Sequence, residues 1–240
     1  MIVTGHQPQY LPYIGLFNKI AKSDIFLFTD NVQFLKESWQ SRTIIKSPKD
    51  EILYLSINVK TKNRSTQLIK DVEVADLKWQ KKHIQTIKQN YSKTQYFDEI
   101  FPILEKYYIN EIKFLIDITI PLLIEMINLL KINVNIDYCS NLQIDGSKTT
   151  ALIQKCIKTN SDTYLAGQGG KNYIDIQEFK KNNLNILFNN FVHPVYKQTG
   201  QKFLEGMAII DLFFNEGIEN SRKIFWDNIN NKPKFESFSE

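Results

Sequence analysis

The clearest pattern of apolar and polar positions lies in the first thirty residues. Apolar runs at residues 2–4 and 25–28 flank a segment in which Ile14, Phe17 and Ile20 share one face of a helix. Continuous runs of β-branched or aromatic residues are typical of buried parallel strands. The pattern therefore predicts a strand, a loop, a helix and a second strand.

The middle of the chain shows a hairpin pattern and then a helical one. Two β-rich runs flank the turn residues 47–50, which predicts an antiparallel hairpin over residues 42–59. A short strand is expected near 69–74. Helical spacing then dominates residues 77–130, where Pro121 is expected to kink or split the last of three helices.

After residue 132 the alternation of strands and helices resumes. Strands are predicted at 132–138, 162–166 and 185–191, and helices at 151–158, near 179–182 and at 207–214, ending at Gly217. Such alternation is typical of α/β folds. We therefore expect one α/β domain over residues 1–217, with a mainly parallel Rossmann-like sheet, the antiparallel hairpin and the helical insertion. Residues 218–240 form a C-terminal helix or tail, whose last dozen residues are expected to be frayed.

Composition limits the class of protein. The chain has 240 residues, 42% of them hydrophobic, which is enough for a globular core. No apolar run approaches the roughly 20 residues that span a bilayer, and no signal peptide is recognised at the N-terminus. Cys139 and Cys156 form no CxxC pattern, which suits a reducing cytoplasm. The three histidines are far apart, so no metal site is predicted.

A net charge of +4 permits an anionic substrate but does not indicate a nucleic-acid-binding protein. The basic stretch at residues 60–64 is expected to be a solvated loop. His83, on a helix of otherwise packed residues, is expected to be structural.

Polar groups follow three of the predicted strands. The stretches are 5–10 (GHQPQY), 167–173 (GQGGKNY) and 193–198 (HPVYKQ). Ligands of open parallel sheets bind beyond the carboxyl ends of the strands, where such loops converge. His6 and Asp30 follow the first two strands, so this edge of the sheet is the predicted site.

These residues have both functional and structural interpretations. His6 and His193 are candidate proton carriers near neutral pH, but each also suits a fixed position at a strand end or a His-Pro turn. Asp30 is a candidate acid or base, or a turn former. The glycines near Lys171 could bring backbone N–H groups to a phosphate, or could form a tight turn with φ > 0. Their spacing matches neither a Walker loop nor GxGxxG.

Several of these motifs resemble one family. Residues 6–20 (HQPQYLPYIGLFNKI), followed by 24–26, 30–34 and 39–42 (WQSR), are similar to the WbqC-like family. The resemblance continues at 79–83, 164–167, Gly170, Tyr173, 193–198 and 209–217, and so spans residues 2 to about 217. The family more often has Trp in place of Tyr13 and Ser-Gly in place of residues 166–167. These departures affect details of the pocket rather than membership.

The resemblance implies a place in bacterial O-antigen or other surface-polysaccharide biosynthesis. It also implies transfer of glycine, or a similar amino acid, to an amino sugar. We therefore hypothesise a cytoplasmic aminoacyl or acyl transferase that acts on a nucleotide-linked amino sugar. The activated carbonyl would come from aminoacyl-tRNA, from a thioester on an acyl carrier protein, or from activation by ATP, so tRNA and the carrier protein are candidate partners.

The resemblance assigns no catalytic residues, and the roles here are inferred from chemistry. His6, His193 and Asp30 are the candidate catalytic residues. Substrate-binding candidates include amide, hydroxyl and cationic groups for donor, sugar and phosphates, together with neighbouring loop residues: Gln7, Tyr10, Gln33, Trp39, Arg42, Lys46, Gln168, Gly169, Gly170, Lys171, Tyr173, Tyr196 and Gln198.

Two alternatives remain open. The opening strand–histidine–helix unit is similar to that of HIGH-type nucleotidyltransferases, although their second histidine is missing here. An ATP-dependent nucleotidyltransferase or ligase is therefore one alternative. The other is a non-catalytic protein that binds a sugar nucleotide.

Overall fold

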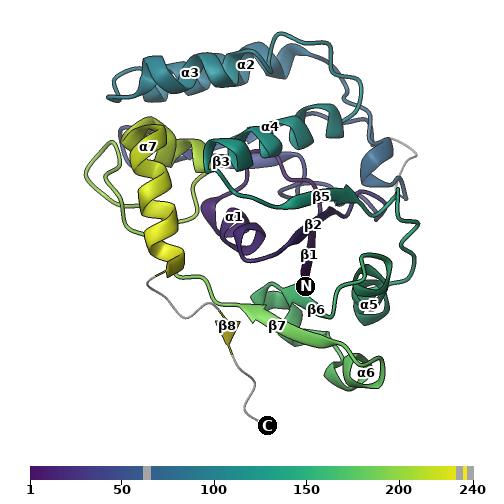
Figure 1. Cartoon of the computed structure of the whole chain (residues 1–240). Helices are drawn as coiled ribbons and strands as arrows, with labels where there is room; N and C mark the ends of the chain where they lie inside the picture. Colours follow the sequence, from purple (N-terminus) through teal and green to yellow (C-terminus); the bar gives the residue numbers. More distant parts are fainter. Residues whose placement is uncertain (62–65, 231–234, 237–240) are drawn as a thin grey trace.

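The structure is a computed structural model that describes residues 1–61, 66–230 and 235–236. Most of the basic stretch expected to be a solvated loop, and most of the C-terminal dozen expected to be frayed, lie outside the described residues. Figure 1 shows a central sheet with helices on both of its faces.

The main sheet has the expected, mainly parallel arrangement. Its strand order is β5-β2-β1-β6-β7-β8, and every pair is parallel except β7 with β8. The strands are β1 (Ile2–His6), β2 (Ile25–Phe28), β5 (Asn135–Tyr138), β6 (Thr163–Ala166), β7 (Asn185–Asn189) and β8 (Phe235–Glu236). Strand β1 is central, and the direction of chain progression reverses between β1 and β6. The prediction of an α/β fold with a mainly parallel sheet is confirmed.

Helices cover the two faces unequally (Figure 1). On one face α5 (Lys148–Lys158) and α6 (Ile176–Lys181) enclose a small core that includes the free thiols of Cys139 and Cys156. The larger core lies on the other face. It is covered by α1 (Ile14–Ala21), α2 (Lys78–Tyr91), α3 (Phe97–Glu105), α4 (Ile116–Leu129) and α7 (Ile209–Asn230).

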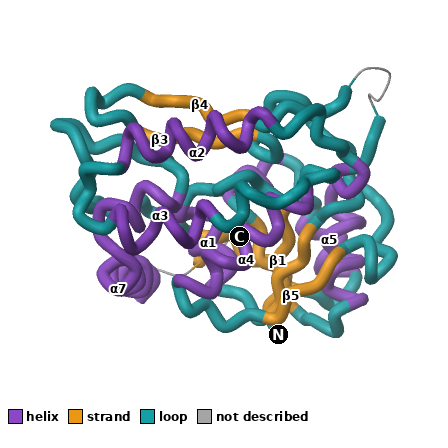
Figure 2. The backbone as a smooth tube through the Cα atoms, turned by 90° about the horizontal axis from the view of Figure 1, so that it is seen from above, coloured by secondary structure: helices purple, strands orange, loops and turns teal. Residues whose placement is uncertain are grey.

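The predicted hairpin is present as a separate two-stranded sheet. Strands β3 (Arg42–Lys46) and β4 (Ile52–Ser56) pair antiparallel, as the turn residues between them predict. Figure 2 shows the hairpin beside α2 and apart from the strands of the main sheet. Its inner residues Ile45 and Leu55 are buried in the larger core, so the hairpin forms part of the fold.

Two local predictions differ from the structure, and a third is confirmed. The strand expected near 69–74 is a short 3-10 helix, η1 (Ile69–Asp71), accompanied only by isolated bridges. Pro121 does not split α4, because the missing N–H removes one helical bond while Leu122 and Leu123 are fully buried. The expected helix end at Gly217 is confirmed: this residue has non-helical torsion angles (φ 71°, ψ 171°), and a second helical segment follows it to Asn230 within α7.

His83 has the structural environment that was expected for it. It lies on α2 at 2% exposure, among the rings of Tyr10, Trp79 and Tyr108. Its Nδ1 is 2.9 Å from the hydroxyl oxygen of Tyr10. Burial lowers the pKa of His83 from 6.5 to about 4, so the ring is neutral in the folded protein at pH 7.

This burial predicts loss of stability in acid. The folded protein resists protonating His83, whereas the unfolded chain takes up the proton near pH 6.5. The stabilising contribution is therefore present above pH 6.5 and is lost as the pH falls towards 4, at a total cost of about 3 kcal/mol. Urea unfolding at a series of pH values should show this slope. His83→Gln should reduce the slope, and an equal slope in both proteins would contradict the assignment.

Candidate functional site

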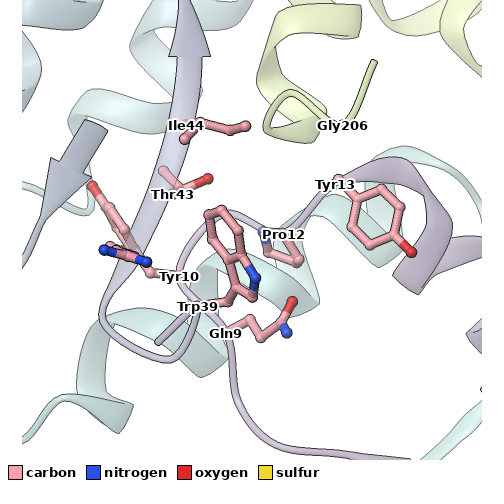
Figure 3. Close-up of a pocket in the computed structure, with 9 residues that line it drawn as sticks. Gln9, Tyr10, Pro12, Tyr13, Trp39, Thr43, Ile44 and Gly206 are labelled. Carbon is pink, nitrogen blue, oxygen red and sulfur yellow. The ribbon is translucent and has the colours of Figure 1, made fainter. Parts of the chain in front are cut away.

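A pocket of about 390 Å³ opens where the loop after β1 meets the hairpin and the loop before α7 (Figure 3). Polar groups and exposed aromatic rings both contribute to its wall. The lining residues are Gln9, Tyr10, Pro12, Tyr13, Trp39, Arg42, Thr43, Ile44 and Gly206. The motif at 6–20 and the WQSR segment, far apart in the chain, therefore form one site.

Backbone hydrogen bonds hold these segments together. The N–H of Tyr10 donates to the carbonyl oxygen of Trp39 at 3.1 Å. The N–H of Ala208 donates to the carbonyl oxygen of Ile44 at 2.9 Å, which joins the segment before α7 to the hairpin. The pocket wall is therefore fixed by main-chain bonds that do not depend on a ligand.

The loop after β1 also contains backbone strain. Leu11 is completely buried and has a φ of 43°, a conformation that residues other than glycine rarely adopt. The hydroxyl of Thr43 donates to the Leu11 carbonyl at 2.8 Å and helps to hold this conformation. Strained backbone is concentrated at functional sites, where surrounding structure enforces it. The strain supports the identification of this loop as part of a site.

Arg42 is the cation of the pocket. Its guanidinium lies 5.5 Å from the ring centre of Trp39 and 5.3 Å from that of Tyr54. Its Nε is buried without a hydrogen-bond partner, and no carboxylate of the described residues forms an ion pair with it. Arg42 also lines a neighbouring pocket of about 490 Å³. A guanidinium held between rings and without a counter-ion is suited to binding an anion.

Gln7 lies next to this pocket. The side-chain amide of Gln40 donates to Gln7 Oε1 at 2.7 Å, and Gln40 Oε1 accepts from the N–H of Leu35 at 3.0 Å. Gln40 is buried. The orientation of the predicted binding residue Gln7 is thus set by the segment that carries Trp39.

His6 is neutral at the end of β1. Its Nδ1 lies 3.0 Å from the carbonyl oxygen of Gln7, so that nitrogen carries the hydrogen and Nε2 carries the lone pair. Burial, followed by the charge of Lys19, lowers the pKa of His6 to about 3. At neutral pH the ring can accept a hydrogen bond at Nε2, and its low pKa makes it a weak base.

His193 is held by backbone groups on both ring nitrogens. Nδ1 lies 2.8 Å from the carbonyl oxygen of Pro194, and Nε2 accepts from the N–H of Gly206 at 3.2 Å. Because Gly206 lines the pocket, His193 positions the pocket wall. Both ring nitrogens of His193 are engaged in this arrangement, so no lone pair is left for the predicted catalytic role. The geometry supports a positioning role.

Asp30 joins the ends of two strands. Its carboxylate accepts from the N–H of Ser140 at 3.0 Å and from the Ser140 hydroxyl at 2.5 Å, and the residue is buried. These bonds connect the segments that follow β2 and β5. The geometry supports a structural role for Asp30 rather than the acid or base role expected from the sequence.

Lys46 requires a correction. It was expected to meet a phosphate, but its Nζ donates to the carbonyl oxygens of Thr199 and Lys202 and forms an ion pair with Asp50 at 2.9 Å. These partners use all three donors of a side chain that is 1% exposed. Lys46 ties the hairpin to the loop before α7 and has no donor for a ligand.

Tyr196 and Gln198 also face inward. The Tyr196 hydroxyl and the Gln198 amide donate to Asp211 Oδ2 at 2.8 and 2.9 Å. Asp211 is 1% exposed. These two predicted binding residues therefore belong to a hydrogen-bond network inside the protein, because the loop that carries them packs onto α7.

The glycine-rich stretch forms a 3-10 turn, η2 (Gln168–Asn172), at the end of β6. The alternative interpretation of this stretch as a tight turn with positive φ is wrong, because none of its glycines has one. Gly170 is needed for close packing instead, since a Cβ there would lie 2.7 Å from Ile174. Gln168 donates to the carbonyl oxygen of Asn189 at 2.5 Å, which joins η2 to the end of β7.

The other predicted binding residues lie outside the pocket lining. Lys171 lies over the ring of Phe188 at 5.8 Å, and Tyr173 is exposed beside it. Gly169 has open space where a Cβ would lie. Gln33 is exposed and forms a backbone bridge with Leu68. Of the predicted binding set, the structure brings Tyr10, Trp39 and Arg42 into the pocket, with Gln7 adjacent.

Sequence reasoning missed six lining residues: Gln9, Pro12, Tyr13, Thr43, Ile44 and Gly206. The first three stand within the motif at 6–20, so they could have been selected from it. Gly206 comes from a segment with no distinctive pattern. In the part of the chain that the structure describes, no group of three or more His, Cys, Asp or Glu side chains is placed to hold a metal ion. None of the described helices combines the length and apolar content needed to cross a membrane.

Comparison with known proteins gives two matches. The family model described as the WbqC-like protein family matches residues 7–223. An uncharacterized protein of Mycobacterium tuberculosis, Rv1507c, is 26% identical over 215 residues, which cover 89% of this chain and 93% of that protein. No solved structure matches significantly. The family match includes every residue that lines the pocket.

Proposed function

The chain belongs to the WbqC-like protein family, and from that premise we propose that it is a cytoplasmic transferase of surface-polysaccharide (O-antigen) biosynthesis. It moves an aminoacyl or acyl group to the amine of a nucleotide-linked amino sugar. The activated carbonyl is supplied by aminoacyl-tRNA, by an acyl carrier thioester or by activation with ATP.

The observation that carries the proposal is the pairing of Arg42 with exposed aromatic rings in one pocket. Trp39 is 46% exposed and Tyr13 is 42% exposed, so both rings offer faces to a sugar or a base. Arg42 offers a planar set of donors to a phosphate. A pocket of about 390 Å³ with these groups is suited to part of a sugar nucleotide.

The proposed reaction forms an amide. The sugar amine attacks the activated carbonyl carbon, the new C–N bond forms, and the bond from that carbon to its oxygen or sulfur leaving group breaks. His6 Nε2, whose lone pair is kept by the Nδ1 bond to Gln7, accepts a hydrogen bond from the amine and orients it, and the amine proton passes to the leaving group. His193 and Asp30 act in this proposal by holding the surrounding loops.

The test combines binding with turnover. UDP-glucosamine, which has a free amine, should raise the melting temperature of the protein more than UDP-glucose does. Mixed with candidate donors, it should yield an N-acylated product in mass spectrometry. His6→Asn should keep the melting shift but lose the product.

Other outcomes would favour the alternatives. Release of AMP or pyrophosphate from ATP without acylation of the sugar would favour the nucleotidyltransferase or ligase. Binding that is followed by no turnover with any donor would favour a sugar-nucleotide-binding protein. Absence of binding would contradict the proposed acceptor.

A further inference from the structure

Two lysines are buried against the end of the central strand. Lys19 of α1 donates from its Nζ to the carbonyl oxygen of Gly5 at 3.0 Å. Lys155 of α5 donates from its Nζ to the hydroxyl of Thr29 at 2.9 Å. The helices that carry them lie on opposite faces of the sheet (Figure 1). Two amines therefore reach the same level of β1 from its two faces.

Glycine at position 5 makes this approach possible. A Cβ there would lie 2.9 Å from Lys155 Nζ and 3.2 Å from the hydroxyl oxygen of Thr29. Any larger residue would displace the amine from the strand. Val3, two residues earlier on the same face of β1, packs in the small core beside α5. At Gly5 the Lys155 amine occupies the place that an apolar side chain would otherwise fill.

These two charges lack a counter-ion. Lys19 is 7% exposed and Lys155 is 4% exposed, and neither forms an ion pair with a carboxylate of the described residues. Burial, and then the charge of Lys155, lowers the pKa of Lys19 to about 7. Burying unpaired cations costs folding free energy, and a bound anion would remove that cost.

The neighbouring strand leaves room for such an anion. Strand pairing between β1 and β6 is present at only two positions, Ile2 with Thr163 and Val3 with Tyr164. If this register is continued along both strands, His6 lies opposite Gly167, beyond the last paired position. A Cβ on Gly167 would have no neighbour within 4 Å, so the position opposite His6 is open.

The reversal of chain direction also falls here. The chain leaves β1 through α1 on one face and enters β6 from α5 on the other, so the two connections diverge. Crevices of this kind, outside the carboxyl ends of strands at a reversal of strand order, are where α/β sheets bind ligands.

We propose that the carboxyl end of β1, between β1 and β6, is a binding site for a phosphate or pyrophosphate group, with Lys19 and Lys155 supplying the charge. The site uses none of the residues that line the 390 Å³ pocket. It adjoins His6, the last residue of β1, but pyrophosphate binding there does not depend on acyl transfer. The phosphate belongs either to a sugar nucleotide or to ATP, which share this chemistry.

The experiment measures pyrophosphate binding to the full chain by calorimetry at constant ionic strength. Lys19→Met and Lys155→Met should each raise the Kd about tenfold or more, because a charge-assisted contact is lost. Lys158→Met is the matched control: it removes an exposed charge from the same helix and should leave the Kd unchanged.

The melting temperature is a second measurement. If the two lysines had a purely structural role, replacing them would lower it. Without anions, the two buried-site methionine variants should melt at a higher temperature than the unaltered protein, because an unpaired buried cation is gone. Co-crystallisation of the unaltered chain with pyrophosphate locates the anion without any variant. Displacement of pyrophosphate by ATP or by UDP-glucosamine then identifies the source of the phosphate.

Three results would overturn the site. One is no binding of pyrophosphate to the unaltered chain. Another is an equal loss of affinity in Lys158→Met. The third is pyrophosphate density located away from β1 in the co-crystal.

Discussion

Arg42→Met is expected to weaken binding of UDP-glucosamine about tenfold to a hundredfold, because a charge-assisted contact to phosphate is worth about 1.5–3 kcal/mol. The fold should be unaffected. Arg42 forms no ion pair among the described residues and its Nε has no hydrogen-bond partner, so its removal leaves no buried group unsatisfied. Methionine keeps an unbranched side chain between the rings of Trp39 and Tyr54. Calorimetric titration measures the change directly.

Two further variants sharpen this test. Lys36→Met removes an exposed charge beside the neighbouring 490 Å³ pocket and should change the Kd little. Arg42→Lys keeps the charge but loses the planar donors and the stacking. Its Kd should therefore lie between those of Lys36→Met and Arg42→Met. If Arg42→Met bound UDP-glucosamine as tightly as the unaltered protein, Arg42 would not be the anion-binding group of the pocket.

Asp211→Ala is expected to destabilise the protein by about 3–5 kcal/mol, since it leaves several buried donors without an acceptor. The carboxylate accepts from the hydroxyls of Tyr91 and Tyr196, both at 2.8 Å, and from the amide of Gln198 at 2.9 Å. Burial raises the pKa of Asp211, while these three donors oppose that rise. The expected loss is a large part of the roughly 5–15 kcal/mol that stabilises a typical protein.

Urea unfolding at neutral pH measures this loss. Tyr196→Phe removes a single donor and should cost only about 1 kcal/mol. Asp211→Asn keeps one acceptor oxygen, so its loss of stability should lie between those of Tyr196→Phe and Asp211→Ala. A cost for Asp211→Ala no greater than that for Tyr196→Phe would show that the network contributes little to stability.

The same network connects stability to the pocket. Asp211 lies in the first turn of α7, and Ile209 at the start of that helix donates its N–H to the carbonyl oxygen of Pro12 at 3.0 Å. Gly206, which lines the pocket, precedes the helix by three residues. Loss of Asp211 should therefore weaken ligand binding as well as lower stability.

Local pattern was sufficient for much of the fold. Residues 2–4 and 25–28 are strands and residues 14–21 a helix because each signal, an apolar run or a helical face, depends only on neighbours in the chain. The hairpin was predictable for the same reason, since residues 47–50 are turn formers between two β-rich runs. Gly217 was predictable in the same way: glycine marks the break in α7, and burial of Phe225 and Ile229 stabilises the helical segment after it.

The candidate site was only partly predictable. The motif at 6–20 and the WQSR segment led to Tyr10, Trp39 and Arg42, because both stretches combine polar and aromatic residues beside predicted strands. The same reasoning selected Lys46 wrongly. Its partners Thr199 and Lys202 lie about 150 residues away, and no local pattern indicates that their carbonyls would use its donors.

The sequence by itself therefore determined which segments are strands and helices, the α/β class, the family, and the importance of the opening motif. Only the tertiary structure decided which polar groups face a pocket and which are used inside. Lys19 and Lys155 illustrate the difference: in the sequence they are two ordinary lysines on amphipathic helices. Secondary structure follows from periodicity over a few residues, whereas the partner of a polar group depends on segments that only the folded chain brings together.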